Sequence, residues 1–329
     1  MLRAVKEEDR GKLITVSYSK LSLKDQCDYR YFQKYVKGNY SVKGSIATDI
    51  GSILHKGLEL KGRYKLQRED VNYDEIIDTV LQGCEEKTDK GSEKLIGIDE
   101  IKKKYFEEWG SSDNASGMNY NEKMDVYFHD VLPTRMEDSD WKILGTEIKF
   151  EFVYDEKCII HGFIDRIDAK YEKEKIIALR VVDYKSSKKV FRDTDIKTPL
   201  QMVVYDLACL FMYGILPEYH EYDFVLLDQK QTTADGVCSK GYMKRGIKKL
   251  DKILNSIIQC EKQSLYAPNP TPLCYWCEFA DRSHTPNADS KFAGFCQYYS
   301  LWKPDQKNFK VNKEFIPGEP EKPKRKIMI

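Results

Sequence analysis

A long apolar run is missing from this sequence. No stretch of its 329 residues approaches the roughly 18 consecutive apolar residues that a membrane-spanning helix requires. The first residues, MLRAVKEEDRGK, are too charged for a secretory signal peptide. Both observations predict a cytoplasmic protein that works without a membrane.

An excess of charge of one sign is also missing. The 54 Lys and Arg residues nearly balance the 53 Asp and Glu residues, which leaves a net charge of +1. The molecule as a whole therefore has no general attraction for a polyanion. Nucleic-acid binding would have to be local, and three basic clusters, at 185–192, 240–252 and 322–326, are candidates. Taken alone, each cluster is more typical of a solvated helix face or a tail than of a nucleic-acid site.

Cysteine, by contrast, is plentiful, with nine residues. In a reducing compartment thiols are metal ligands or apolar filler more often than disulfides, and an odd number disfavours a disulfide framework. Cys274 and Cys277, in CYWC, have the Cys-x2-Cys spacing that lets both sulfurs reach one metal ion or cluster.

Hydrophobic periodicity predicts an α/β protein. Helices are expected at 17–36, 48–64, 196–213 and 241–262, and strands at 143–154, 158–169, 176–184 and 222–228. The first three strands have short polar links, so we expect an antiparallel meander. In its first strand, Thr146, Ile148, Phe150 and Phe152 alternate and are expected on one face.

The same patterns predict one large domain with a short extension and a tail. The boundaries that we expect are an N-terminal extension at 1–16, a single domain at 17–301 and a flexible Lys/Pro-rich tail at 302–329. Within the domain, we expect a helical insertion at about 66–141, a core at about 142–230 and a C-terminal helix with cysteines at about 240–301.

Two carboxylates on neighbouring strands suggest a metal site. Asp183 and Lys185 in VVDYK are two residues apart on a strand, so both side chains point to one face. Asp165, in GFIDRID on the preceding strand, comes close to Asp183 if the register is near ideal. Such a pair repels unless a cation offsets its charge, and hard oxygen ligands suit Mg²⁺ or Mn²⁺. A strand end can also expose an Asp-x-Lys pair without any function.

The series of His55, GFIDRID, VVDYK and QMVVY resembles the PD-(D/E)xK nuclease superfamily. The resemblance is to the RecB-like and AddB-like exonuclease branch with a cysteine-ligated iron–sulfur cluster, the type that includes CRISPR-associated RecB-like nucleases. It spans nearly the whole chain. It implies a restriction-endonuclease-like core, in which helices flank a central mixed sheet, with a C-terminal metal-cluster subdomain.

The resemblance also implies roles for individual residues. The metal ligands would be Asp165, Asp183, His55 and the backbone carbonyl of Tyr184. Lys185 would orient the attacking water or help to deprotonate it, and would offset charge on the phosphate.

Three further residues are expected near these ligands. Gln201 and Tyr205 lie four apart on a predicted helix, so they share a face and become site residues by the resemblance; otherwise they form a polar helix edge. Glu147 is expected only to contact the metal ligands, and not to bind the metal itself.

The resemblance assigns four of the cysteines to a [4Fe-4S] cluster: Cys27, Cys274, Cys277 and Cys296. The long segment before Cys296 departs from the family pattern. His284, within that segment, is an alternative fourth ligand, in which case a structural Zn²⁺ site is expected instead.

The function implied is a metal-dependent deoxyribonuclease, an exonuclease acting on single-stranded DNA or DNA ends. The alternatives are a non-catalytic DNA-binding subunit of a recombination or repair complex, and a sequence-specific endonuclease, since one fold serves many functions. The expected partner is DNA, with a recombination, replication or helicase protein docking through the basic tail.

Overall fold

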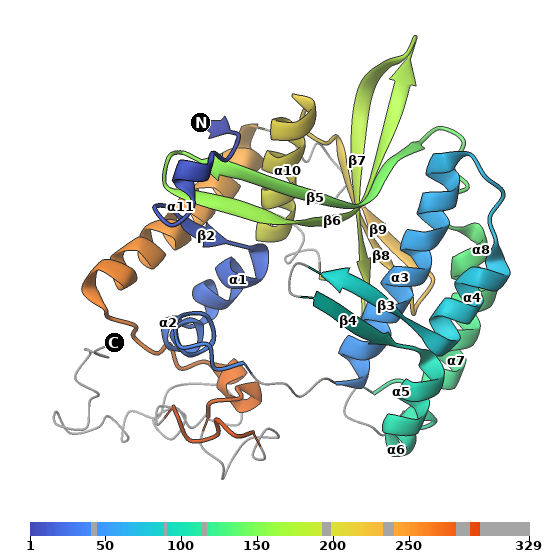
Figure 1. The fold of residues 1–329 in the computed structure, drawn as a ribbon, viewed down its shortest axis with the longest axis horizontal. Coiled ribbons are helices and arrows are strands. Elements are labelled where there is room, and N and C mark those ends of the chain that lie inside the picture. Colours follow the sequence, from blue (N-terminus) through green and yellow to red (C-terminus); the bar gives the residue numbers. More distant parts are fainter. Residues whose placement is uncertain are drawn as a thin grey trace. The chain divides into compact units, whose positions relative to one another are not determined.

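The computed structural model describes residues 1–40, 45–88, 91–112, 117–192, 199–232, 240–280 and 290–296 (Figure 1). The chain forms two compact units. Unit 1 comprises Met1–Val5, Gly44–Phe152 and His161–Gly246, and unit 2 comprises Lys6–Lys43, Val153–Ile160 and Ile247–Ile329. His284, the tail at 302–329 and its basic cluster at 322–326 lie outside the described residues.

The main sheet has the strand order β1-β5-β6-β7-β8-β9, and β2 also pairs with β6. The strands are β1 (Leu2–Arg3), β2 (Ile14–Val16), β5 (Lys142–Tyr154), β6 (Cys158–Glu172), β7 (Lys175–Lys185), β8 (Tyr219–Phe224) and β9 (Gln229–Thr232). Strands β6 and β7 are antiparallel, β7 and β8 parallel, and β8 and β9 antiparallel. The predicted α/β fold with a central mixed sheet is therefore confirmed.

The longest helix of unit 1, α3 (Ile46–Gln67), begins at Ser45, whose hydroxyl accepts a hydrogen bond from the N–H of Thr48. Its predicted apolar stripe of Ile50, Leu54 and Leu58 is fully buried. The other helices of this unit are α4 (Tyr73–Gln82), α5 (Ile98–Lys104), α6 (Phe106–Trp109), α7 (Tyr120–Val126), the π-helical turn η3 (Tyr127–Val131), α8 (Leu132–Thr134) and α10 (Leu200–Tyr213). The stripe packs into one core with residues of these insertion helices and of β7.

The segment expected as a helical insertion also contains a β-hairpin, which the sequence did not predict. Strands β3 (Gly83–Thr88) and β4 (Gly91–Ile96) pair antiparallel. The backbone at Gly83 has a φ of +87°, and a Cβ there would lie 2.3 Å from the carbonyl oxygen of Leu95. The charged sequence gives no apolar alternation, and this close backbone approach at a glycine starts the hairpin instead.

The strand expected at 222–228 is wrong in its second half. Strand β8 ends at Phe224, and the next four residues form a turn into β9. Val225 and Leu226 are fully buried in the core of unit 1. The apolar run thus reflects burial in a turn, which periodicity cannot distinguish from a short buried strand.

In unit 2, the helix expected at 17–36 is interrupted at Cys27. Its parts are α1 (Tyr18–Gln26), α2 (Asp28–Tyr31) and the π-helical turn η2 (Phe32–Val36). Cys27 is extended, with φ −163° and ψ 119°, although no glycine or proline is near. The side-chain amide of Asn269 donates to the carbonyl of Gln26 at 3.0 Å, and its backbone N–H donates to the sulfur of Cys27 at 3.4 Å. Contacts from a distant segment thus satisfy the broken helix end.

The remaining elements are the short η1 (Glu7–Asp9), the basic helix α11 (Lys240–Gln263), which was predicted at 241–262, and the 3₁₀ turn η4 (Pro272–Trp276). Among the helices that the structure describes, none is both long and apolar enough to cross a membrane.

Candidate active site

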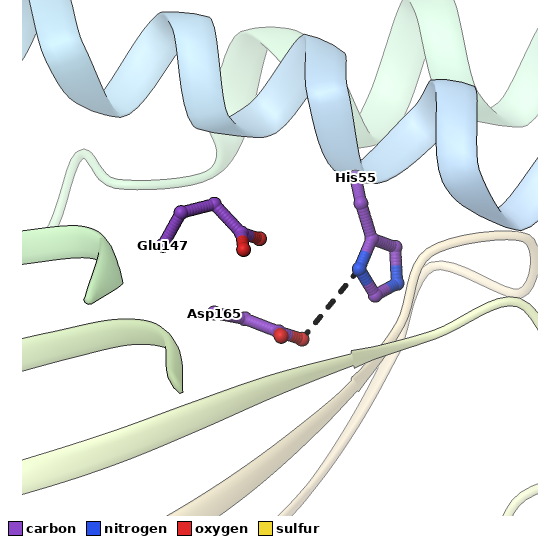
Figure 2. Close-up of side chains that lie close together, drawn as sticks. All are labelled: His55, Glu147 and Asp165. Atoms are coloured by element: carbon purple, nitrogen blue, oxygen red, sulfur yellow. Dashed lines mark ion pairs between the residues drawn. The ribbon is translucent and has the colours of Figure 1, made fainter. Parts of the chain in front are cut away.

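Three side chains from three elements of unit 1 converge on one point: His55 of α3, Glu147 of β5 and Asp165 of β6 (Figure 2). One ligand atom from each lies within 4.8 Å of the other two. The imidazole Nδ1 of His55 is 3.7 Å from a carboxylate oxygen of Asp165. One nitrogen and two carboxylates at this spacing suit a divalent cation.

A left-handed residue interrupts the regular backbone of β5 at the site. Glu147 has a φ of +46°, which non-glycine residues rarely adopt. Before it, Thr146 packs so closely on α3 that a Cβ at Gly62 would lie 2.3 Å from its methyl group. After it, the rings of Phe150 and Phe152 contact Tyr205 and Phe211 of α10. Thr146 and the two phenylalanines thus contact different helices, so the regular alternation expected from Thr146 to Phe152 does not hold across Glu147.

Burial perturbs all three groups. It lowers the pKa of His55 to about 4, so the imidazole is neutral at pH 7 and offers a lone pair. It raises the pKa of Asp165 to about 6, although the N–H of Tyr184 and the Lys185 ammonium act in the opposite direction. Burial and the Asp165 carboxylate together raise the pKa of Glu147 to about 8. The site therefore resists negative charge unless a cation is present.

A second group of side chains follows the end of β7. The ammonium of Lys185 forms an ion pair with the buried carboxylate of Asp183 and donates to the side-chain oxygen of Gln201 at 3.2 Å. The amide nitrogen of Gln201 donates to Asp183 at 2.8 Å and to the hydroxyl of Tyr205 at 2.9 Å. Gln201 thus holds both Asp183 and Lys185 in fixed positions. It can also contact Tyr205 because the two residues lie on the same face of α10, as predicted.

Tyr184 joins the two groups. Its backbone N–H donates to the carboxylate of Asp165 at 2.7 Å, and its ring meets the ring of His55 edge-on, with centroids 5.6 Å apart. The paired register of β6 and β7 ends with Arg166 opposite Val182, so the next position places Asp165 beside Asp183. Burial, and to a lesser extent the Asp165 charge, raises the pKa of Asp183 to about 6.

A buried network of ion pairs and hydrogen bonds holds the side chain of Tyr184 in place. The guanidinium of Arg166 donates to the Tyr184 hydroxyl at 2.8 Å and to both carboxylate oxygens of Asp168, at 2.9 and 3.1 Å. Arg180 donates to the same carboxylate at 2.7 and 2.9 Å. Arg166 and Asp168 are each only 1% exposed. Partners that hold ligand-bearing backbone in this way reduce the freedom of the site.

A separate pocket lies in unit 2 and is lined by four cysteines, Cys27, Cys274, Cys277 and Cys296. Backbone N–H groups approach two of the sulfurs: that of Asn269 lies 3.4 Å from Cys27, and that of Thr271 lies 3.3 Å from Cys274. Burial raises the pKa of Cys277 to about 12, so a thiolate there needs a nearby cation.

A family model described as the PD-(D/E)XK nuclease superfamily matches residues 15–282, which include both the site and the Cys-x2-Cys pair. The chain belongs to this superfamily. Membership supports the coarse prediction of a nuclease, a phosphodiester hydrolase, and agrees with the mixed sheet that carries Asp165 and Asp183.

Two curated relatives of this superfamily member are ATP-dependent helicase/deoxyribonuclease subunits B. That of Clostridium tetani is 30% identical over 213 residues, which cover 58% of this chain and 17% of the relative. That of Streptococcus uberis is 27% identical over 197 residues, covering 57% of this chain and 15% of the relative. The chain thus matches only about a sixth of the length of either protein.

The side chains expected at the site of this nuclease-family chain lie close to one another. Among the described residues, however, Asp183 is not one of the three grouped potential ligands, and its carboxylate contacts Lys185 and Gln201 instead. Glu147 lies closer than expected, since it is one of three potential ligands rather than a group behind them. The buried network of Arg166 and Asp168 was missed. Its signal in the sequence was a pair of charged residues on either side of Ile167, in addition to Asp165, within the strand segment GFIDRID.

Proposed function

We propose that this protein is a divalent-metal-dependent deoxyribonuclease, an exonuclease that acts on single-stranded DNA or DNA ends. The observation that carries the proposal is the convergence of His55, Glu147 and Asp165 beside the Asp183–Lys185 pair. Three titratable groups with perturbed pKa values beside an ordered ammonium are typical of a functional site.

The residues fit Mg²⁺ or Mn²⁺. His55, Glu147 and Asp165 would hold the ion, with Asp183 and the backbone carbonyl of Tyr184 as the further ligands that the family resemblance implies. The set is dominated by oxygen, which favours these hard cations over zinc. When bound, the ion supplies an activated water and withdraws charge from the phosphate.

The side chains of the protein have complementary tasks. Lys185, held by Asp183 and Gln201, places an ammonium where it can donate to a phosphate oxygen and offset charge that develops there. Tyr205, whose pKa burial raises well above its ordinary value, remains a neutral hydrogen-bond donor or acceptor beside Gln201. Tyr184 and Arg166 keep Asp165 and His55 in position.

DNA as substrate, and a helicase as partner, are supported by the relatives, whose names describe helicase/deoxyribonuclease subunits. Both remain proposals for this much shorter chain, as do the exonuclease mode and a cytoplasmic location. The retained Asp183–Lys185 pair argues against the non-catalytic DNA-binding alternative, because a binding subunit has no need of that ammonium.

Digestion of end-labelled DNA tests the proposed function. We expect single-stranded DNA, or the ends of a duplex, to be shortened progressively with Mg²⁺ or Mn²⁺ and not with EDTA, because the site resists its own negative charge without a cation. Discrete internal fragments would instead indicate an endonuclease. Intact DNA under all metal conditions, together with DNA binding, would favour the non-catalytic subunit.

We also propose that the four-cysteine pocket holds a [4Fe-4S] cluster rather than Zn²⁺. The resemblance implies this set of four cysteine ligands, and all four line one pocket. Backbone N–H groups donate to the sulfurs of Cys27 and Cys274, and such hydrogen bonds are typical of the thiolates that hold an iron–sulfur cluster.

Metal analysis of anaerobically purified protein tests the cluster. We expect about four iron atoms per chain and the visible absorption of an iron–sulfur chromophore. The variant Cys274→Ser should lose both, whereas Cys84→Ser, which changes a partly exposed cysteine of β3, should keep them. Zinc in place of iron would show that the alternative is correct.

A further inference from the structure

A groove lies in unit 1 where the C-terminal end of α3, the start of β5 and the hairpin between β6 and β7 come together. We call it the hairpin groove. Its walls include Leu66 in the last turn of α3, Arg68 just after α3, Trp141 and Lys142 at the start of β5, and Tyr171 of β6. None of these residues belongs to the candidate active site.

The three elements that form the hairpin groove are those that carry the potential metal ligands. Along α3, Leu66 lies 11 residues after His55, which corresponds to about 16 Å at the helical rise. Along β5, Lys142 lies five residues before Glu147, which is about 17 Å in a strand. Along β6, Tyr171 lies six residues after Asp165, or about 20 Å. Along each of the three elements, the groove therefore lies about 16–20 Å from the potential metal ligands.

The groove combines apolar surface with cations. Leu66 and Tyr171 are each 40% exposed, so both side chains are accessible to a ligand. The ammonium of Lys142 lies 5.9 Å from the centroid of the Tyr171 ring. The ring of Trp141 is fixed by Arg180 and Lys170, at 4.8 and 4.9 Å, so it forms a rigid wall while the Tyr171 ring stays accessible.

The acidic residues near the groove are mostly neutralised. Glu137 is paired with Lys61 and Lys65 at 2.9 and 2.5 Å. Asp138 and Asp140, which follow it, pair with Arg180 and Lys170, at 3.2 and 3.9 Å. Glu174, at the hairpin turn, is the one carboxylate in the groove lining. Arg68 and Lys142 leave a local positive charge on a molecule whose net charge is only +1.

We propose that the hairpin groove binds single-stranded nucleic acid on the strand that is being cut, several nucleotides from the scissile phosphate. Bases stack on exposed aromatic rings whatever their sequence, while cations at the rim contact phosphates. At roughly 3.4 Å per stacked nucleotide, a separation of about 16–20 Å corresponds to about five or six nucleotides. The inference rests on the proposed nuclease function, and it adds a substrate-length requirement to it.

Binding and cleavage of oligonucleotides of two lengths test the proposal. The variants are Tyr171→Ala and the double change Arg68→Ala with Lys142→Ala. The double change Lys12→Ala with Lys103→Ala is the matched control, because it removes equal charge from exposed positions outside the groove. Binding is measured by fluorescence anisotropy without added metal, so that it does not depend on catalysis.

We expect both groove variants to bind a 15-nucleotide single strand about tenfold more weakly than the wild type, which is within the range for a lost stacking contact or two lost phosphate contacts. For the charge variant the dependence of affinity on salt should weaken by about 1.4 in the log–log slope. A strand of about four nucleotides, too short to reach from site to groove, should be cleaved at the wild-type rate.

The outcomes separate this proposal from the nuclease function. If the wild type cuts DNA and the groove variants bind the long strand normally, the groove has another role, such as docking an acidic peptide, and the proposal is wrong. An equal loss for short and long strands also contradicts it. If the wild type cuts no DNA but the groove variants still lose binding, the groove stands and the nuclease function fails.

Discussion

Replacement of Lys185 with alanine is expected to slow DNA cleavage by about 100- to 1000-fold, the usual cost of removing one donor that stabilises transition-state charge. The ammonium is held by Asp183 and by Gln201, so it is ordered before substrate arrives. Binding of DNA and of Mn²⁺ should remain near the wild-type values. Single-turnover cleavage rates and separate binding titrations would measure these effects.

A neighbouring lysine provides the control. Lys189 is exposed and lies only four residues further along, so Lys189→Ala changes the net charge equally without touching the Asp183–Gln201 contacts. It should cut DNA at the wild-type rate. If Lys185→Ala cuts as fast as the wild type, the ammonium has no part in the chemistry.

Replacement of Asp165 with asparagine is expected to abolish detectable cleavage and to weaken Mn²⁺ binding by more than about 100-fold, because partners that merely orient a ligand already cost 10- to 100-fold. The amide oxygen can still accept the hydrogen bond from the N–H of Tyr184, so the local backbone should stay in place. Isothermal titration with Mn²⁺ and end-labelled DNA digestion would measure the two losses. Wild-type Mn²⁺ affinity in the variant would remove Asp165 from the ligand set.

The same change should not reduce stability. In the metal-free fold the pKa of Asp165 is about 6, above its ordinary value of 3.8. Ionisation of Asp165 therefore lowers the free energy of unfolding as pH rises from about 3.8 to about 6. Asparagine cannot ionise, so the variant does not lose this stability. At pH 7.5 the metal-free variant should melt at or above the wild-type temperature.

Asp168, three residues along the same strand, should behave in the opposite way. Its carboxylate is buried and paired with both Arg166 and Arg180, so Asp168→Asn leaves two buried cations poorly compensated. Such losses cost about 3–5 kcal/mol. A variant at 168 that melts like the wild type would contradict the structural role of the network.

The sequence predicted those parts of the fold and site that depend on strict periodicity. Asp183 and Lys185 share a strand face because strands alternate, and Gln201 and Tyr205 share a helix face because helices repeat. The role of Glu147 was underestimated because its left-handed backbone conformation interrupts the two-residue period on which the prediction for this strand depends.

Other features depend on contacts between distant segments. The helical segment expected at 17–36 is interrupted at Cys27, although no glycine or proline near Cys27 predicts a break. The hydrogen bonds that stabilise the interruption come from Asn269. The hairpin of β3 and β4 has a charged sequence without apolar alternation. Neither feature could be predicted from local preferences, because in both the tertiary environment outweighs them.

The left-handed backbone at Glu147 has a consequence for how this protein can change. A non-glycine residue in that conformation costs about 1 kcal/mol or more, and the carboxylate is also penalised by its buried, acidic surroundings. Glycine at position 147 would remove both costs at once. A laboratory selection for thermal stability alone would therefore replace Glu147 early. The selected variants would melt at a higher temperature but would have an impaired metal centre.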